Sequence, residues 1–397
     1  MSNKLIPLSV PNLKGNELKY VSSAIESEWV STAGPYVNAF EEKFAEYVNT
    51  LGAVSCQSGT AGLHIALILT GLTKDDAVLV PTLTFIAAIN PVKYIGASPI
   101  FMDCDDSLCI DPEKVEEFCK NECDFVEGRL IERESRKHIK VLLAVHVFGN
   151  MSDMGSLTKI AKKYNLKVVE DATEALGTHY TDGIYKECHA GTIGEIGVYS
   201  FNGNKIITTG GGGMIVSNNE DYLKRARHLT TQAKSNELYF EHDEVGYNYR
   251  MTNIQAALGL AQLEQLENFV RAKIENYEFY KKAFTKIKGA ELLPFRKSTR
   301  SNHWFYSLCC KNLRLKRDDM IQYLSKNRVQ TRPVWGLIHK QIPYREDKAY
   351  RIEKAEYYWK YIVNIPCSTN LSRNDMQQVI DLIKQADIAK VGTTYEK

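Results

Sequence analysis

The sequence predicts an α/β protein with a large, mostly parallel-sheet domain and a smaller α+β C-terminal domain. Short β-branched runs alternate with helical segments from about residue 52 to 230, which is typical of a sheet covered by helices on both faces. The pattern changes near residue 253, and 397 residues are enough for two hydrophobic cores. We expect the large domain over residues 1–255 and the small domain over 256–397.

Strands and helices of the large domain are expected in alternation. The candidate strands are the apolar runs 77–81, 98–103, 140–149, 166–171, 197–202 and 212–218. Helical spacing of apolar residues occurs in segments 59–72, 111–120 and 153–165. Asp111 is a candidate N-cap, with Pro112 at the first helical position. Residues 121–139 are dense in charge and poor in period, so we expect a solvated excursion there.

The C-terminal region begins with strong helical periodicity. Residues 253–284 repeat apolar side chains at helical spacing with charges between them, which predicts one long helix leaving the large domain. A charged helix is expected from about Arg317 to Asn327, and a final helix after Ser372.

Composition argues against several classes of protein. The 50 basic and 48 acidic residues leave a net charge of +2, so we expect neither a nucleic-acid partner nor a membrane partner. The first residues lack the apolar core of a signal peptide, and the nine cysteines never form a C-x-x-C pair. We therefore expect a cytoplasmic protein with reduced thiols and no metal site. His64 and His146 lie in apolar contexts and are expected to be core residues.

A lysine before four glycines, in "SFNGNKIITTGGGG", is the first candidate for chemistry. Lys205 follows a predicted strand, and the glycines let the backbone approach a ligand closely. A lysine nucleophile has to lose its proton, which burial favours. Taken alone, the stretch is more typical of a surface lysine before a flexible loop.

A strand-end carboxylate, a helix start and an aromatic residue change that interpretation. Asp171 directly follows an apolar strand, so we expect it to point into the crevice where open α/β sheets bind ligands. Together with a reactive lysine, this carboxylate suits pyridoxal phosphate, because an anion beside the ring nitrogen keeps that nitrogen protonated. An N-cap is the alternative role. Gly59 and Thr60 open a helix whose free N–H groups suit a phosphate, and Phe85 suits either a flat ring or the core. This order of features is that of the aspartate aminotransferase fold (fold type I).

The whole chain resembles the DegT-type nucleotide-sugar aminotransferases. The resemblance includes "SGTAGLHIAL", "VEDATEALG" and "GYNYRMTNIQAALGLAQLEQL". Within that group, "NGNKIITTGGGG", "LTTQAK" and "IPLSVPNLKGNE" resemble most the enzymes of the legionaminic acid and bacillosamine pathways. Those enzymes aminate a 4-keto-6-deoxy sugar nucleotide with a 2-acetamido group. The resemblance implies UDP-2-acetamido-2,6-dideoxy-hexos-4-ulose as substrate, with a GDP-linked sugar left open.

The resemblance also implies roles for individual residues. Lys205 would form the internal aldimine with pyridoxal 5′-phosphate, Asp171 would contact the pyridine nitrogen, and Glu174 would approach the phenolic oxygen, where many relatives have glutamine. The remaining implied cofactor-binding residues are Gly59, Thr60 and Ser200 at the phosphate, Phe85 against the ring, and Asn248, which reaches the phosphate from the neighbouring subunit of a homodimer. Glutamate would convert the cofactor to pyridoxamine phosphate, and Lys205 would shuttle the proton when the sugar ketone is aminated at C4.

The sugar-nucleotide end of the site is harder to assign. Thr32, Arg332 and His339 are candidates by analogy and by the affinity of arginine for phosphate, with structural or surface roles as the alternative. A 3-keto sugar aminotransferase stays open. A dehydratase of the same family would carry histidine in place of Lys205, and a non-catalytic sensor would not need Lys205, Asp171 and the glycine turn together.

Overall fold

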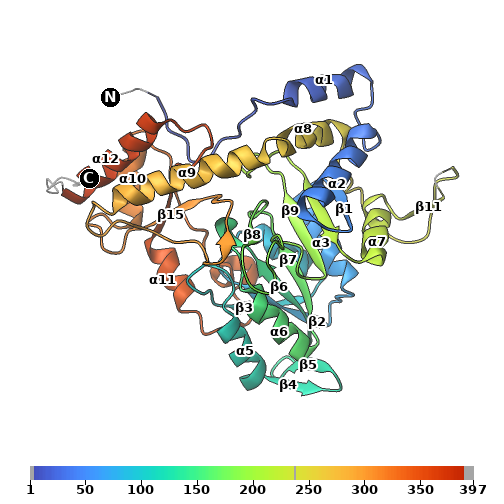
Figure 1. The fold of residues 1–397 in the computed structure, drawn as a ribbon. Helices are drawn as coiled ribbons and strands as arrows, with labels where there is room; N and C mark the ends of the chain where they lie inside the picture. The colour runs from blue at the N-terminus through green and yellow to red at the C-terminus, as the bar shows by residue number, and fades with distance from the viewer. Residues whose placement is uncertain (1–3, 237, 389–397) are drawn as a thin grey trace.

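The computed structural model describes residues 4–236 and 238–388. Figure 1 shows a large unit built around a twisted central sheet and a second unit that contains β15, α10 and α12, with the helices α8 and α9 running along one side of both. The predicted α/β class with a mostly parallel sheet is confirmed.

The central sheet has ten strands in the order β1-β10-β9-β7-β6-β2-β3-β17, with β5 and β4 attached beside β6. Pairing is parallel from β9 through to β17, whereas β10 pairs antiparallel with both β9 and β1. The strands are β1 (Gly52–Cys56), β2 (Asp76–Pro81), β3 (Ser98–Met102), β4 (Cys123–Val126), β5 (Arg129–Glu132), β6 (His138–Val145), β7 (Lys167–Asp171), β9 (Ile196–Ser200), β10 (Gly213–Ser217) and β17 (Ala349–Tyr350).

Both faces of this sheet are buried. Alternate residues of β6 belong to two separate cores: Val141, Leu143 and Val145 to one, Leu142 and Ala144 to the other. The first core contains residues of α3 (Gly59–Leu69), α4 (Asn90–Tyr94) and α7 (Glu220–Thr230), and the second contains residues of α2 (Pro35–Val48), α5 (Pro112–Asn121) and α6 (Met154–Tyr164). The first core also continues into the second unit through residues such as Tyr306 and Ile365.

The second unit is a four-stranded antiparallel sheet in the order β13-β15-β18-β16 with helices packed on it. Its strands are β13 (Glu291–Leu292), β15 (Tyr306–Cys309), β16 (Arg332–Pro333) and β18 (Ile362–Ile365). The remaining helices of the chain are α1 (Glu17–Glu26), α8 (Asn253–Leu263), α9 (Leu266–Phe284), α10 (Arg317–Lys326), α11 (Lys354–Tyr361) and α12 (Arg373–Ile388). Two short pairs complete the fold: β8 (His179–Tyr180) with β14 (Thr299–Arg300), and β11 (Lys234–Asn236) with β12 (Glu241–His242).

The expected solvated excursion over residues 121–139 is wrong in part, because β4 and β5 form a hairpin there and β5 joins β6. Glu127 and Gly128 both have positive φ, which suits a two-residue hairpin turn. The buried face of β5 includes Glu132, which is 1% exposed and accepts a hydrogen bond from Lys348 at 2.8 Å. The alternating pattern of β5 was not apparent in the sequence, because the charged residue Glu132 occupies an inward-facing position.

Of the other predicted helices and strands, some are confirmed and some differ in the structure. The single long helix expected over residues 253–284 is two helices, α8 and α9, although no proline or glycine stands between them. The capped start of α5 is confirmed, since Asp111 accepts a hydrogen bond from the Glu113 amide at 2.9 Å. The charged helix α10 and the final helix α12 lie where they were predicted. The strand β1 was not among the predicted strands.

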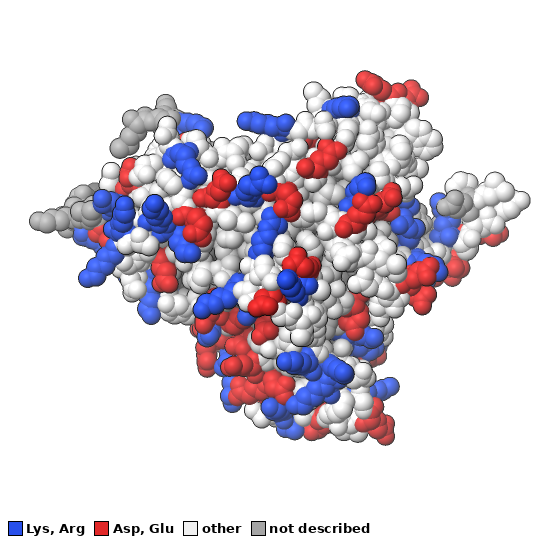
Figure 2. Space-filling model, viewed as in Figure 1, with Lys and Arg blue, Asp and Glu red and all other residues white. Residues whose placement is uncertain are grey.

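On the face drawn in Figure 2, basic and acidic side chains are interspersed. Within residues 4–236 and 238–388, no helix combines the length and the apolar character that crossing a membrane requires. All nine cysteines are free, and all but Cys188 are buried.

Candidate active site

A cavity of about 330 Å³ opens where several strands of the central sheet end. Asp171 is the last residue of β7 and Ser200 the last of β9, so both project from carboxyl ends of strands, where open α/β sheets bind ligands. Seven of the predicted site residues line this cavity: Gly59, Thr60, Phe85, Asp171, Glu174, Ser200 and Lys205.

The turn after β9 places Lys205 in the cavity. The amide of Lys205 donates to the Asn202 carbonyl at 3.0 Å, which closes the turn. The glycine run then brings β10 against the start of α3: a Cβ on Gly213 would lie 2.6 Å from the Ser58 carbonyl carbon and 2.8 Å from the Gly59 nitrogen. Gly213 is therefore needed for the close approach of β10 to the helix start.

The Lys205 side chain is 12% exposed and lies between a carboxylate and an indole ring. Its Nζ is 3.5 Å from Oε1 of Glu174, whose side chain is 4% exposed, and 4.1 Å from the ring centroid of Trp304. An amine held in this way is sheltered from bulk water and has both an anion and an aromatic face beside it.

Asp171 lies in the floor of the cavity and is 3% exposed. Its Oδ1 accepts a hydrogen bond from the Thr173 amide at 3.0 Å. No helix follows within residues 172–178, so the alternative role as a helix N-cap is not what the structure shows. Burial raises the pKa of Asp171, and the hydrogen bonds from Thr173 oppose that shift.

Glu174 is fixed at one oxygen only. Its Oε2 accepts a hydrogen bond from the Phe148 amide at 2.7 Å, while Oε1 faces Lys205. Burial raises the pKa of Glu174 to about 7, against the lowering effect of the nearby ammonium. The cavity therefore contains a carboxyl group that titrates near neutrality.

The start of α3 forms a cradle for an anion. Ser58 caps the helix by accepting a hydrogen bond from the Ala61 amide at 3.1 Å, and Gly59 and Thr60 line the cavity at the positive end of the helix dipole. A Cβ on Gly59 would lie 2.9 Å from Cβ of Ser200, so only glycine leaves room there. A phosphate cradle, an amine and a strand-end carboxylate in one cavity fit pyridoxal phosphate.

An aromatic wall, which we define as Phe85, Trp304, Phe305 and Trp335, closes the other side of the cavity. Trp304 stacks on Phe305 with ring centroids 4.0 Å apart, and its indole N–H donates to the Asn204 carbonyl at 2.8 Å. Behind the wall, the buried ammonium of Lys273 donates to the carbonyl of Trp304 at 2.9 Å and to that of Cys367 at 2.8 Å. Phe85 was a predicted site residue with a core role as the alternative, and no pattern in the sequence distinguished the other three rings from core residues.

Four predicted residues lie outside this cavity lining. Asn248 is exposed and bridges to Thr231. Thr32 is half-buried in the loop before α2, and Arg332 is exposed on β16. His339 is half-buried, and its Nδ1 lies 2.6 Å from Oγ1 of Thr82. Within one chain, none of the four contacts the group formed by Lys205, Asp171 and Glu174, so their predicted roles stay proposals.

A second buried carboxylate lies next to Asp171 on β7. Glu170 is fully buried and accepts hydrogen bonds from the amides of Gly191, Ile193 and Gly194 at 2.5–2.9 Å, and from Nε2 of His146 at 2.8 Å. The predicted core positions of His146 and His64 are confirmed by exposures of 0% and 7%.

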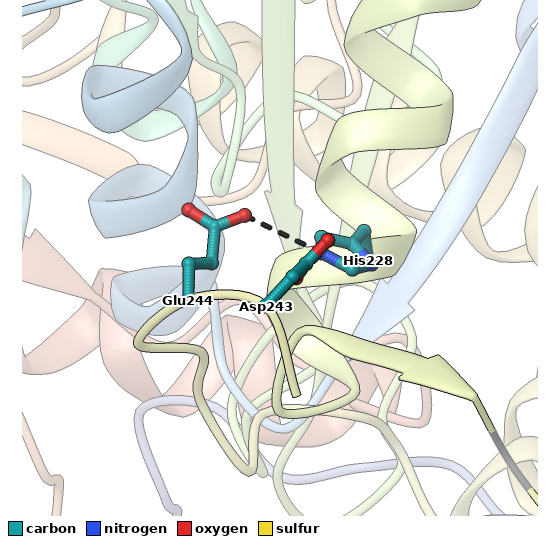
Figure 3. Close-up of side chains that lie close together, drawn as sticks. All are labelled: His228, Asp243 and Glu244. Atoms are coloured by element: carbon teal, nitrogen blue, oxygen red, sulfur yellow. Dashed lines mark hydrogen bonds and ion pairs between the residues drawn. The ribbon is translucent and has the colours of Figure 1, made fainter. Parts of the chain in front are cut away.

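One cluster in the described part of the chain has donor atoms close enough to suggest a metal. Figure 3 shows His228, Asp243 and Glu244 converging at the end of α7, with ligand atoms within 4.8 Å of one another. His228 Nε2 lies 2.7 Å from Asp243 and 3.3 Å from Glu244, and Arg225 pairs with Glu244. The guanidinium already neutralises one carboxylate of the exposed cluster, so the arrangement is an ion-pair network rather than a metal centre.

Comparisons with known proteins agree with this site. The model of the DegT/DnrJ/EryC1/StrS aminotransferase family matches residues 11–384. A relative from Bacillus subtilis, EpsN, named as a pyridoxal phosphate-dependent aminotransferase, is 35% identical over 96% of this chain and 95% of its own. The GDP-perosamine synthase of Escherichia coli O157:H7 is also 35% identical, over 96% of this chain and 98% of its own.

The solved structures agree as well. The aminotransferase TlmJ from Streptoalloteichus hindustanus superposes with a TM-score of 0.85 and 26% identity, over 96% of this chain and 98% of its own. The match spans both the central sheet and the unit that carries Trp304, Phe305 and Trp335. The chain belongs to the DegT/DnrJ/EryC1/StrS aminotransferase family and is a pyridoxal phosphate-dependent sugar aminotransferase.

Proposed function

We propose that this enzyme transfers an amino group from glutamate to C4 of a nucleotide-linked 4-keto-6-deoxy sugar. The expected substrate is UDP-2-acetamido-2,6-dideoxy-hexos-4-ulose, in a pathway of the legionaminic acid or bacillosamine type. The observation that carries transamination is the position of Lys205, an amine 12% exposed and 3.5 Å from a carboxylate in a cavity with an anion cradle. A histidine at this position would favour dehydration instead.

Each cavity residue then has a task that its surroundings support. The start of α3 binds the cofactor phosphate, Asp171 holds positive charge at the ring nitrogen, and Phe85 covers the ring. Pyridoxal phosphate, when bound, supplies the electron sink that stabilises negative charge on the carbon next to the transferred nitrogen. Lys205 moves a proton at that carbon in both half-reactions. Because glutamate and the sugar react in turn, we expect ping-pong kinetics.

The nucleotide of the substrate is tested directly. The name of the E. coli relative specifies a GDP-linked sugar, so GDP competes with UDP. Purified enzyme should be given glutamate with UDP- and GDP-linked 4-keto-6-deoxy hexoses, each with and without a 2-acetamido group, and the products identified by NMR. Amination of only the GDP sugar without the acetamido group would overturn the UDP assignment. A nucleotide-linked 3-keto sugar is offered in a parallel reaction, and its amination at C3 in place of the 4-keto sugars would overturn the regiochemistry.

We also propose a homodimer in which Asn248 reaches the phosphate of the partner's site. Asn248 is exposed and lies outside the cavity lining of its own chain. The nearby β11–β12 hairpin projects from the molecule (Figure 1), with Leu238, Tyr239 and Phe240 exposed by 76%, 70% and 73%. Such an apolar tip is typical of a surface covered by a partner.

A cytoplasmic location agrees with nine free cysteines.

Mixing two inactive variants tests the shared site. Lys205→Ala and Asn248→Ala chains, co-refolded in equal amounts, should regain about a quarter of wild-type activity, because each mixed dimer contains one intact site. No gain above the sum of the separate variants would contradict the contribution of Asn248 across the interface.

A further inference from the structure

The cavity holds one amine and two carboxyl groups, which is an unusual charge balance for a buried site. Lys205 contributes one positive charge, while Asp171 and Glu174, 3% and 4% exposed, would contribute two negative charges if both were ionised. Burying an excess negative charge is costly, so the site favours keeping one more proton than the isolated groups would hold.

We propose that Glu174 is a second proton-transferring residue of the site, whose Oε1 takes a proton from Nζ of Lys205 when the amine has to be neutral and returns it when the amine has to act as an acid. One N–H bond of the ammonium breaks and one O–H bond forms, so the ion pair becomes a neutral amine and a neutral acid. The total charge of the pair is unchanged. This inference rests on the proposed function, in which Lys205 is the catalytic amine.

The geometry of Glu174 assigns the proton to one oxygen. Oε2 is held by the Phe148 amide at 2.7 Å, whereas Oε1 faces Nζ of Lys205 at 3.5 Å. Catalytic hydrogen bonds are often longer than about 3 Å before substrate binds. The other charged group that faces Glu174 is Asp171, on β7, whose anion disfavours ionisation of Glu174. Phe148 contributes only its backbone N–H.

The titration of Glu174 supports this assignment. Burial raises the pKa of Glu174 to about 7, with the Asp171 carboxylate acting in the same direction. A carboxyl group with such a pKa accepts and releases a proton near neutral pH. Glutamine at this position would keep the contact with the Phe148 amide and lose the proton.

The direct test measures the amine rather than turnover. Cofactor-free wild type and Glu174→Gln are trace-labelled with acetic anhydride across pH 5–10, and labelling of Lys205 is followed by peptide mass spectrometry. Removing the anion destabilises the ammonium, so the labelling curve of Glu174→Gln should move to lower pH by about one unit, or about tenfold more label at a fixed pH on the rising limb. Glu356→Gln, which breaks only an exposed pair with Lys340, is the matched control and should leave the curve in place.

Coincident curves for wild type and Glu174→Gln would overturn the proposal. The reciprocal variant Lys205→Met gives an independent answer if Glu174→Gln does not fold: with the cation gone, the carboxyl of Glu174 should titrate at higher pH, observed by infrared spectroscopy of cofactor-free protein, and an unchanged titration would also overturn the proposal. Borohydride fixation of pyridoxal phosphate on Lys205 tests the proposed function separately. If borohydride fixes pyridoxal phosphate on Lys205 but the labelling curves coincide, the proposed transamination is retained and only the proposed role of Glu174 is contradicted.

Discussion

Two buried acid–base pairs lie close together around the end of β7, and they are built differently. Glu170 and His146 are both fully buried, and Glu170 accepts four hydrogen bonds, three of them from backbone amides. Glu174 accepts one backbone hydrogen bond and otherwise faces Lys205 across a cavity. Each pair contains a buried carboxylate, and the two carboxylates differ in how many fixed hydrogen-bond donors they have.

The number of fixed partners determines what each pair is able to do. Nδ1 of His146 accepts a hydrogen bond from the Ser152 amide at 3.1 Å, so Nε2 carries the hydrogen that is donated to Glu170, and both ring nitrogens have fixed partners. Glu174 has an oxygen without a fixed donor, next to an amine and a cavity. The first pair therefore holds the loop at residues 191–194 in place, and the second is free to exchange a proton.

The largest expected effect comes from removing the amine of the second pair. Lys205→Ala should lower glutamate-dependent turnover by at least about 10⁴-fold, because both covalent attachment and proton transfer are lost. Steady-state assays with the sugar substrate measure this, and circular dichroism should show an unchanged fold. Substantial residual transamination would count against the assigned role of Lys205.

Removing the carboxylate of the first pair should act on stability instead. Glu170→Ala strips three amides and a histidine of their acceptor, so the free energy of unfolding of the cofactor-free protein should fall by about 3 kcal/mol or more in urea titrations. Glu170→Gln keeps an acceptor oxygen and should cost less. Equal losses in the two variants would mean that the amide contacts do not matter.

The raised pKa of Glu174 should also make the free energy of unfolding depend on pH. The pKa of Glu174 is raised from 4.5 to about 7 in the folded protein, so the folded state binds more protons than the unfolded state between these values, and its stability falls as pH rises through this window. Relative to Glu174→Gln, cofactor-free wild type should lose about 2 to 3 kcal/mol of unfolding free energy between pH 5 and pH 8. Urea titrations at both pH values measure the difference, and a parallel response of the two proteins would contradict the raised pKa.

The sequence predicted the floor of the cavity well because its residues stand at strand ends. Asp171, Ser200 and Gly59 follow or open regular elements with clear apolar patterns, and the topology of a parallel sheet brings such ends together. Lys205 was singled out by the glycines that follow it, and in the structure Gly213 is where β10 approaches the start of α3 too closely for a side chain. The roles assigned to these residues remain predictions.

The wall of the cavity could not be predicted in the same way. Trp304 and Trp335 come from the C-terminal unit, far along the chain, and an aromatic residue in an apolar run looks the same whether it faces a core or a ligand. The hairpin of β4 and β5 was missed because Glu132 is an inward-facing charge paired with Lys348. The break between α8 and α9 lacks proline and glycine, so helical periodicity continued across it.

The ammonium of Lys273 restricts movement on one side of the cavity and so affects the route by which substrates enter. It is 3% exposed, and two of its three N–H groups are engaged by the carbonyls of Trp304 and Cys367. If the indole segment swung outward, a charged amine would be left in apolar surroundings with one of these partners gone, at a cost of about 1 to 3 kcal/mol or more. The Trp304 side of the cavity is therefore held in place. We expect substrates to enter and products to leave on the side of Phe85, which is 51% exposed.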